Sequence, residues 1–138
     1  MSENLWGDLP APEGGMITPA TILNEQAAVL GERTNNVLFC RVYVVGKSTS
    51  IELDMDIVAT ALDGYRYTLL KVSHPVLLYP LTMFDLTRER KFECANEDEF
   101  RQDLKDILSS PEVHKVISAL LSQSKPLSSG IAVLSGTK

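Results

Sequence analysis

The fold is decided by residues 51–73, which read IELDMDIVATALDGYRYTLLKVS. The first half alternates apolar and acidic residues, a pattern typical of a strand with one buried face. The Asp63-Gly64 dipeptide that follows is the strongest hairpin signal in the chain, because both residues tolerate the positive φ angles of a two-residue turn. The sequence therefore predicts an antiparallel hairpin in which Leu62 lies opposite Tyr65.

A two-residue turn also determines which residues of the hairpin face each other. Counting outward from the turn pairs Ile57 with Leu70 on the face that we take as the core. The same count pairs Asp56 with Lys71 on the opposite face. We therefore expect Asp56 and Lys71 to be cross-strand neighbours outside the core.

A strand over residues 37–45 precedes this hairpin, because β-branched and aromatic residues are enriched there. The loop 46–50 allows two registers, and we choose the one that keeps the apolar residues on one face. It sets Arg41 opposite Asp56, so that Asp56 lies between Arg41 and Lys71. This charged cluster is either a catalytic carboxylate with its partners or a cross-strand ion cluster on a solvated face. We prefer the ion cluster, which is the commoner origin of such a pattern.

Helices are predicted before and after the strands in the sequence. The first covers residues 19–33 and is capped by Thr18. The second begins at a capping box formed by Asn96 and Glu99, and the third is capped by Ser110. All three carry an apolar stripe at helical spacing, so each is expected to pack one side against the sheet.

A fourth strand is expected at residues 76–84, where Pro80 places it at an edge or at a bulge. The predicted fold class is therefore α+β, with an N-terminal helix, an antiparallel meander of three to four strands, and two C-terminal helices packed on the sheet. Residues 1–16 are expected to be a flexible N-terminal arm, residues 17–124 a single α+β domain, and residues 125–138 a flexible C-terminal tail.

Composition and charge exclude several classes of protein. The chain has 138 residues, of which 44% are hydrophobic, and its formal net charge is −5, which is typical of a globular domain. The basic residues are scattered, so direct binding of nucleic acid is not expected. No segment has the pattern of a signal peptide or a membrane span, so we expect a cytoplasmic protein without membrane contact. Two cysteines, Cys40 and Cys94, are too few for a disulfide framework or a thiolate zinc site.

No motif of a known catalytic or cofactor-binding site occurs in the sequence. There is no Gly-x-Gly-x-x-Gly, no phosphate loop, no His-Glu-x-x-His and no nucleophile elbow. A structural or solvated role explains each of the two histidines, His74 and His114, and the thiol of Cys40. We therefore predict no catalytic residue, no cofactor and no metal site.

One group of apolar residues is not explained by a half-solvated sheet. By the predicted register, the face opposite the core carries Tyr65, Tyr67 and Leu69, with Phe39 on the neighbouring strand. Either a helix covers this face or the face is an interface. Together with Trp6, the only Trp of the chain, these residues are the candidates for protein contact.

The function that we prefer from the sequence is a non-enzymatic protein-interaction module: an adaptor, an inhibitor or immunity-type protein, or a subunit of a larger assembly. Its partner would be another protein, and a homo-oligomer is left open. The alternative is a small enzyme or ligand-binding domain with a pocket between the sheet and the C-terminal helices. The polar groups of that pocket would come from Arg41, Asp54, Asp56, Lys71 and His74.

Overall fold

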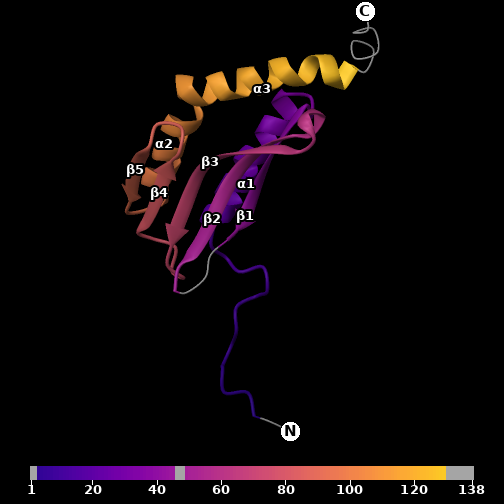
Figure 1. The fold of residues 1–138 in the computed structure, drawn as a ribbon. Coiled ribbons are helices and arrows are strands. Elements are labelled where there is room, and N and C mark those ends of the chain that lie inside the picture. The colour runs from indigo at the N-terminus through magenta and orange to yellow at the C-terminus, as the bar shows by residue number, and fades with distance from the viewer. Residues whose placement is uncertain (1–2, 46–48, 130–138) are drawn as a thin grey trace, which may run out of the picture.

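Residues 3–45 and 49–129, which this computed structural model describes, form five antiparallel strands and three α-helices (Figure 1). The sheet has the order β1-β2-β3-β4-β5, so each strand pairs with its neighbour in sequence. The strands are β1 (Leu38–Val44), β2 (Ile51–Ala59), β3 (Tyr65–His74), β4 (Leu81–Asp85) and β5 (Arg90–Cys94), and the 3-10 helix η1 (Thr60–Leu62) follows β2. The helices are α1 (Pro19–Arg33), α2 (Glu97–Leu108) and α3 (Pro111–Ser129).

The helices α1 and α2 lie on the same face of the sheet, and α3 crosses one end of this layer above η1 (Figure 1). Leu23 of α1 and Phe100 of α2 share one buried cluster with Met55, Leu70 and Met83 of the sheet. Within the described ranges no helix covers the other face, which we call the open face. The fold class is therefore α+β, as predicted, with one strand more than the sequence indicates.

The three helices begin where their sequence signals predict. Thr18 Oγ1 accepts a hydrogen bond from the N–H of Thr21 (3.1 Å), and Asn96 Oδ1 accepts one from the N–H of Glu99 (2.9 Å). Ser110 Oγ accepts a third at the start of α3 (3.2 Å). Each bond satisfies a backbone donor that has no partner inside its helix. The capping side chains therefore decide where these helices start.

The register between β1 and β2 is the predicted one. Arg41 pairs with Asp56, and Cys40 pairs with Ile57. The apolar pair faces the helices and the charged pair faces the other way, because successive residues of a strand point to opposite faces. Burial of one face is therefore a sufficient guide to register in this hairpin.

The predicted register between β2 and β3 is wrong. Residues 60–62 form η1 rather than the end of β2, so the loop spans residues 60–64 and Ala59 pairs with Tyr65. Asp63 and Gly64 do take positive φ angles, of 61° and 74°. The sequence signal therefore marks the turn correctly and gives its length wrongly.

A β-bulge next to Met55 decides which side chains of β3 reach the helices. On one side of the bulge, Met55 pairs with Leu70, and both face the core as predicted. On the other side, Ile57 pairs with Tyr67, so Tyr67 shares the helix side with Ile57 instead of facing away. Leu69, at the bulge, is also buried in the core. The expected apolar patch on the open face is therefore not formed by these two residues.

The last two strands also differ from the prediction. β4 begins at Leu81 rather than at residue 76, because Pro80 lacks the N–H that a ladder requires. β5 is not predicted, since no Gly, Pro or Asn marks the turn at residues 86–89. Asp85 organises that turn instead, because its Oδ1 accepts two backbone N–H groups of the turn (2.9 and 3.3 Å).

The first and the last segments that the structure describes differ in secondary structure. Residues 3–17 contain no helix or strand and lead away from the rest of the molecule (Figure 1). Residues 125–129, assigned to a tail by the sequence, belong to α3, which continues through Pro126 to Ser129. The rest of the predicted tail, residues 130–138, lies outside the described residues, as do residues 46–48 of the first hairpin loop. Among the described helices, none has both the length and the apolar character that crossing a bilayer requires.

Candidate functional site

The spacing of the helices over the sheet leaves a groove between them. Neighbouring strands lie about 4.8 Å apart, so the two edge strands of this sheet are separated by roughly 19 Å. The helix α1 packs on β1 at one edge, and α2 packs on β5 at the other. Helices in direct contact lie only about 8–10 Å apart. The middle of the sheet is therefore covered only by side chains that reach in from both helices.

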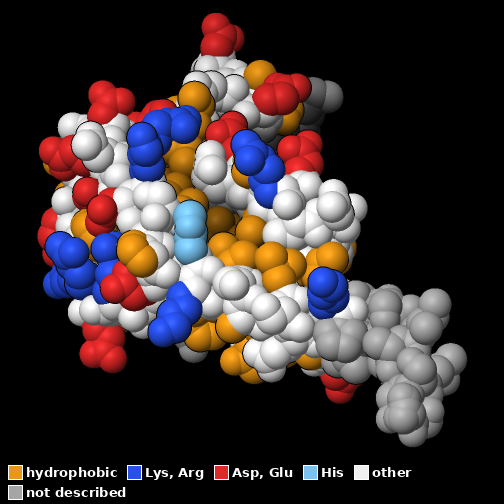
Figure 2. Space-filling view, turned by 90° about the horizontal axis from the view of Figure 1, so that it is seen from above, with side chains coloured by type: hydrophobic (Ala, Val, Ile, Leu, Met, Phe, Trp, Pro, Cys, Tyr) orange, Lys and Arg blue, Asp and Glu red, His pale blue; other side chains and the backbone are white. Residues whose placement is uncertain are grey.

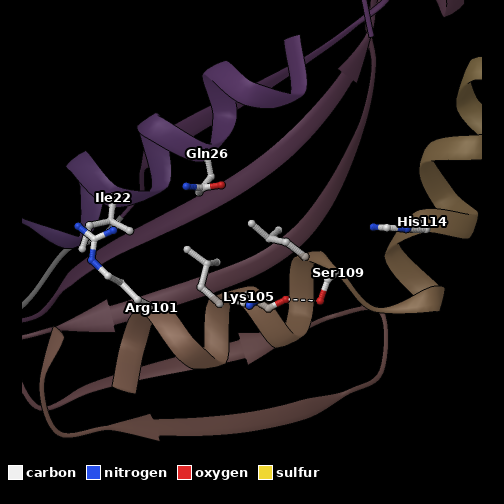
Figure 3. Close-up of a pocket in the computed structure, with 8 residues that line it drawn as sticks. Ile22, Gln26, Arg101, Lys105, Ser109 and His114 are labelled. Atoms are coloured by element: carbon white, nitrogen blue, oxygen red, sulfur yellow. Dashed lines mark hydrogen bonds between the residues drawn. The ribbon is translucent and has the colours of Figure 1, made fainter. Parts of the chain in front are cut away.

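We call this depression the interhelical groove (Figure 3). It consists of two adjoining cavities of about 380 and 190 Å³, which share Gln26, Leu108 and His114. The first cavity lies between α1 and α2 and is lined by Ile22, Gln26, Arg101, Leu104, Lys105, Leu108, Ser109 and His114. The second reaches the sheet and is lined by Gln26, Val29, Leu30, Arg33, Cys40, Met55, Ile57, Leu69, Leu108, Val113, His114 and Ile117.

The base of the interhelical groove is apolar. Cys40, Met55, Ile57 and Leu69 form its floor, and aliphatic side chains of all three helices form most of its walls. Figure 2, a view from the α3 side, shows hydrophobic side chains beside a histidine at a hollow, with basic and acidic side chains farther out on the same face. An apolar concavity with a few polar groups is the usual form of a binding site.

Basic residues stand at the rim of the interhelical groove. Arg33, Arg101 and Lys105 line it, and no Asp or Glu within residues 3–45 and 49–125 does so. Arg101 is paired with Glu97 (Nε to Oε2, 2.8 Å), and that hydrogen bond raises the pKa of Arg101. Arg33 and Lys105 form no ion pair with any described residue. The rim is therefore positive although the whole chain carries a net charge of −5.

The thiols of this protein are protonated at neutral pH. Burial, and to a lesser extent the Asp56 carboxylate, raises the pKa of Cys40 on the groove floor to about 12. Burial also raises the pKa of Cys94 to about 12, and its Sγ donates a hydrogen bond to Asp103 Oδ2 (3.4 Å). Because the thiolate is the nucleophilic form, the groove floor does not supply an activated cysteine.

The rate of alkylation by iodoacetamide at pH 8 reports the protonation of the two thiols directly. Raising a thiol pKa from 9.0 to about 12 lowers the thiolate fraction by about a thousandfold, so Cys40 and Cys94 should both react on that order more slowly than free cysteine. Unfolding in urea should restore the ordinary rate for both thiols, which serves as the control. Labelling of native Cys40 at the rate of free cysteine would contradict the environment described here.

The residues that the sequence singled out for protein contact do not form one patch. Leu69 lies on the groove floor, and Tyr67 packs half-buried against the core. Tyr65 is exposed and lines a separate cavity beneath α3. Phe39 lies on the open face, and Trp6 lies in the N-terminal arm. The structure therefore brings only Leu69 into the groove, and a contact role for the other four stays a prediction.

The predicted charged cluster is divided between two ion pairs on the open face. Asp56 Oδ2 lies 3.5 Å from Arg66 Nε, and Lys71 Nζ lies 3.0 Å from Asp54 Oδ2. Arg41 is the neighbour of Asp56 across β1 and β2. The sequence predicts Asp56 opposite Lys71, but Asp56 pairs with Thr68, because the loop is longer than two residues and β3 contains a bulge. The sheet itself lies between these charges and the groove.

The two histidines lie in different settings. His74 is buried at the end of β3, with Nδ1 2.7 Å from the carbonyl oxygen of Pro75. His114 is exposed and lines both cavities of the interhelical groove. In the part of the chain that the structure describes, no three His, Cys, Asp or Glu side chains are grouped so that they could hold a metal ion. His114 is thus the only histidine among the residues that line the two cavities of the groove.

Sequence reasoning missed the interhelical groove and its rim. One signal was present, since Arg101 and Lys105 are four residues apart and flank Leu104 of the α2 stripe. Arg33 has a similar relation to the α1 stripe, three residues after Leu30. The proximity of the two helices could not be inferred, because it depends on the width of a sheet whose fifth strand is not predicted.

Comparison with known proteins adds no functional information. No family model, no curated protein and no solved structure matches the chain. The function therefore has to be argued from the interhelical groove itself.

Proposed function

We propose that the chain is a non-enzymatic protein-interaction module whose contact surface is the interhelical groove. One observation carries the proposal: the base of the groove is apolar, and its charged lining residues, Arg33, Arg101 and Lys105, are all basic in an otherwise acidic chain. A surface of this kind fits a partner segment that is apolar on one side and acidic on the other.

The shape of the groove supports a polypeptide segment as its occupant. The groove follows the space between α1 and α2, where a further helix would pack. Its two adjoining cavities offer room for several apolar side chains in a row rather than for one compact molecule. An amphipathic helix presents such a row at intervals of three and four residues. The partner is therefore an acidic amphipathic segment.

The enzyme alternative lacks a comparable site. Four of its polar groups, Arg41, Asp54, Asp56 and Lys71, belong to the open face, on the other side of the sheet from the groove. The fifth, His74, lines neither cavity. No arrangement of polar groups around the groove therefore favours catalysis over binding.

Fluorescence anisotropy with two designed peptides tests the proposal. Both are about four helical turns long with leucine along one side, and the remaining positions carry Glu in one peptide and Lys in the other. We expect the acidic peptide to bind and the basic peptide to bind far more weakly. Ile117→Ser should weaken binding by more than about fivefold, because Ile117 lines the groove. Ala119→Ser, at an exposed position of the same helix, should leave it unchanged.

Charge reversal at the rim gives a second test. Arg33→Glu with Lys105→Glu should weaken binding of the acidic peptide and reduce its dependence on salt. Lys91→Glu is the matched control, since Lys91 is on β5 and its exposed pair with Glu93 contributes little to stability. The groove is not the contact surface if both peptides bind equally well. The same holds if neither Ile117→Ser nor Arg33→Glu with Lys105→Glu changes the affinity for the acidic peptide.

A further inference from the structure

The N-terminal arm exposes large apolar side chains without any cover. Leu5 is 84% exposed, Trp6 is 79% exposed and Leu9 is 63% exposed. Trp6 is the only Trp of the chain, and a Trp ring buries more area on contact than almost any other side chain. These residues lie within five positions of each other in the sequence, in a segment that leads away from the folded body (Figure 1). The arm therefore presents a compact apolar anchor to a neighbouring molecule.

The anchor is held in a defined local shape. The backbone N–H of Trp6 donates a hydrogen bond to Asn4 Oδ1 (2.9 Å), and Asn4 Nδ2 donates one to the carbonyl oxygen of Gly7 (3.2 Å). These two bonds hold Leu5 and Trp6 in one turn. Such local order lowers the entropy that the segment loses on binding.

The arm and the interhelical groove have complementary charge. Residues 1–16, the N-terminal arm, contain Glu3, Asp8 and Glu13 and no Lys or Arg, so all charged side chains of the arm are acidic. The charged residues that line the groove are all basic. Arg101 is paired with Glu97, whereas Arg33 and Lys105 have no ion-pair partner within the described ranges. The arm is thus an acidic segment with an apolar anchor, which is the kind of occupant that the groove fits.

We propose that the interhelical groove receives the N-terminal arm of a second copy of this chain. Trp6 and Leu9 enter the apolar base, and the acidic side chains of the arm face the basic rim. This inference rests on the proposed function and names the partner of that groove. The product is a dimer in which the arm of each copy lies in the interhelical groove of the other. Such a two-fold exchange uses both arms and both grooves, so assembly stops at the dimer.

The path of the arm favours a second copy over the same chain. The arm joins α1 at Thr18, next to the end of the groove that Ile22 lines, and from there it runs away from the helices (Figure 1). Trp6 is therefore carried away from the groove of its own chain. Exchange between two copies fills both grooves while each arm keeps this outward path.

Reciprocal charge reversal in the full-length chain tests the proposal. One variant carries Glu3→Lys and Asp8→Lys in the arm, and the other carries Arg33→Glu and Lys105→Glu in the groove. Each variant alone should raise the dissociation constant of the dimer by at least about tenfold in sedimentation velocity. An equimolar mixture should recover a dimer with one chain of each kind, because both of its grooves then meet an arm of opposite charge. Lys91→Glu with Lys115→Glu, which leaves the lining residues unchanged, is the control for net charge.

Quenching of Trp6 by acrylamide distinguishes the remaining outcomes. We expect the wild-type chain to be a dimer in which Trp6 is protected from acrylamide. In each variant alone, acrylamide should quench Trp6. A monomer with protected Trp6 would place the arm in its own groove, and a monomer with quenchable Trp6 would leave the arm unbound. A dimer that tolerates both variants would use another surface. Each of these three results overturns the proposal.

The acidic designed peptide separates this inference from the proposed function. If the peptide binds the groove while the arm variants change neither mass nor quenching, only the arm is misassigned. If the peptide also fails to bind, the groove is not a contact surface and both proposals fall.

Discussion

Replacing Asp85 with alanine is expected to lower the free energy of unfolding by about 3–5 kcal/mol. Asp85 is fully buried, and its Oδ2 accepts a hydrogen bond from Arg88 Nε at 2.6 Å. Its Oδ1 accepts bonds from the N–H and the hydroxyl of Thr87 (2.9 and 2.6 Å). The alanine variant leaves these donors without their acceptor, and the turn between β4 and β5 loses its organising group. Denaturation in urea measures the difference.

The effect of Asp85 should depend on pH in a defined direction. Burial alone would raise the pKa of Asp85, but the hydrogen bonds from Thr87 and Arg88 outweigh burial and lower it. A lowered pKa in the folded state means that the carboxylate contributes full stability above the ordinary Asp pKa of about 3.9. That contribution is lost as the pH falls through the lowered value. The difference between wild type and Asp85→Ala should therefore shrink in acid.

Asp106→Ala is the matched control for this network. Asp106 also bonds to Arg88 (Oδ2 to Nη2, 3.0 Å), but its side chain is more than half exposed. An exposed pair of this kind is worth at most about 1 kcal/mol. Equal losses in the two variants, or a constant effect of Asp85→Ala from neutral pH into acid, would contradict the assigned role.

A loss of about 3–5 kcal/mol is also expected for Phe100→Ala. Phe100 is 0% exposed and lies where the first turn of α2 meets the central cluster. Removing the ring leaves a cavity between α2 and the sheet, and close-packed neighbours fill such a cavity only in part. Thermal or urea denaturation gives the measurement.

Phe84→Ala makes the same change of side chain on the open face. Phe84 is already 36% exposed, so its loss should be clearly smaller than that of Phe100. Equal losses of stability in Phe84→Ala and Phe100→Ala would mean that Phe84 is as closely packed as Phe100. That result would contradict the description of the open face as uncovered.

Local signals in the sequence sufficed for the helices and for one hairpin. Thr18, Asn96 and Ser110 place the helix starts correctly because a capping bond involves residues only three positions apart. The register of β1 and β2 follows from a single requirement, that one face be apolar.

Irregularities of the backbone in segments without a capping or turn signal could not be derived from the sequence. The residues of η1 carry no helix signal of their own, and nothing in the sequence around Met55 and Leu69 announces the bulge. These two features moved Tyr67 and Leu69 to the core side and separated Asp56 from Lys71. The interhelical groove was missed for a similar reason, since it is formed by residues from six elements whose spacing is a property of the whole sheet.

The bulge in β3 has a consequence for how this chain tolerates change. A strand alternates strictly between its two faces, so one extra residue inverts the parity of everything between itself and the next turn. Without the bulge but with all of its residues, β3 would turn Tyr67 outward and bring Arg66 beneath the helices, whereas deleting Leu69 itself, the extra residue, would leave both on their present faces. Substitutions in this hairpin are thus local events, whereas inserting or deleting one residue at a position other than Leu69 exchanges the inside and outside of part of the strand. The evolutionary freedom of this segment lies in the identity of its residues and not in their number.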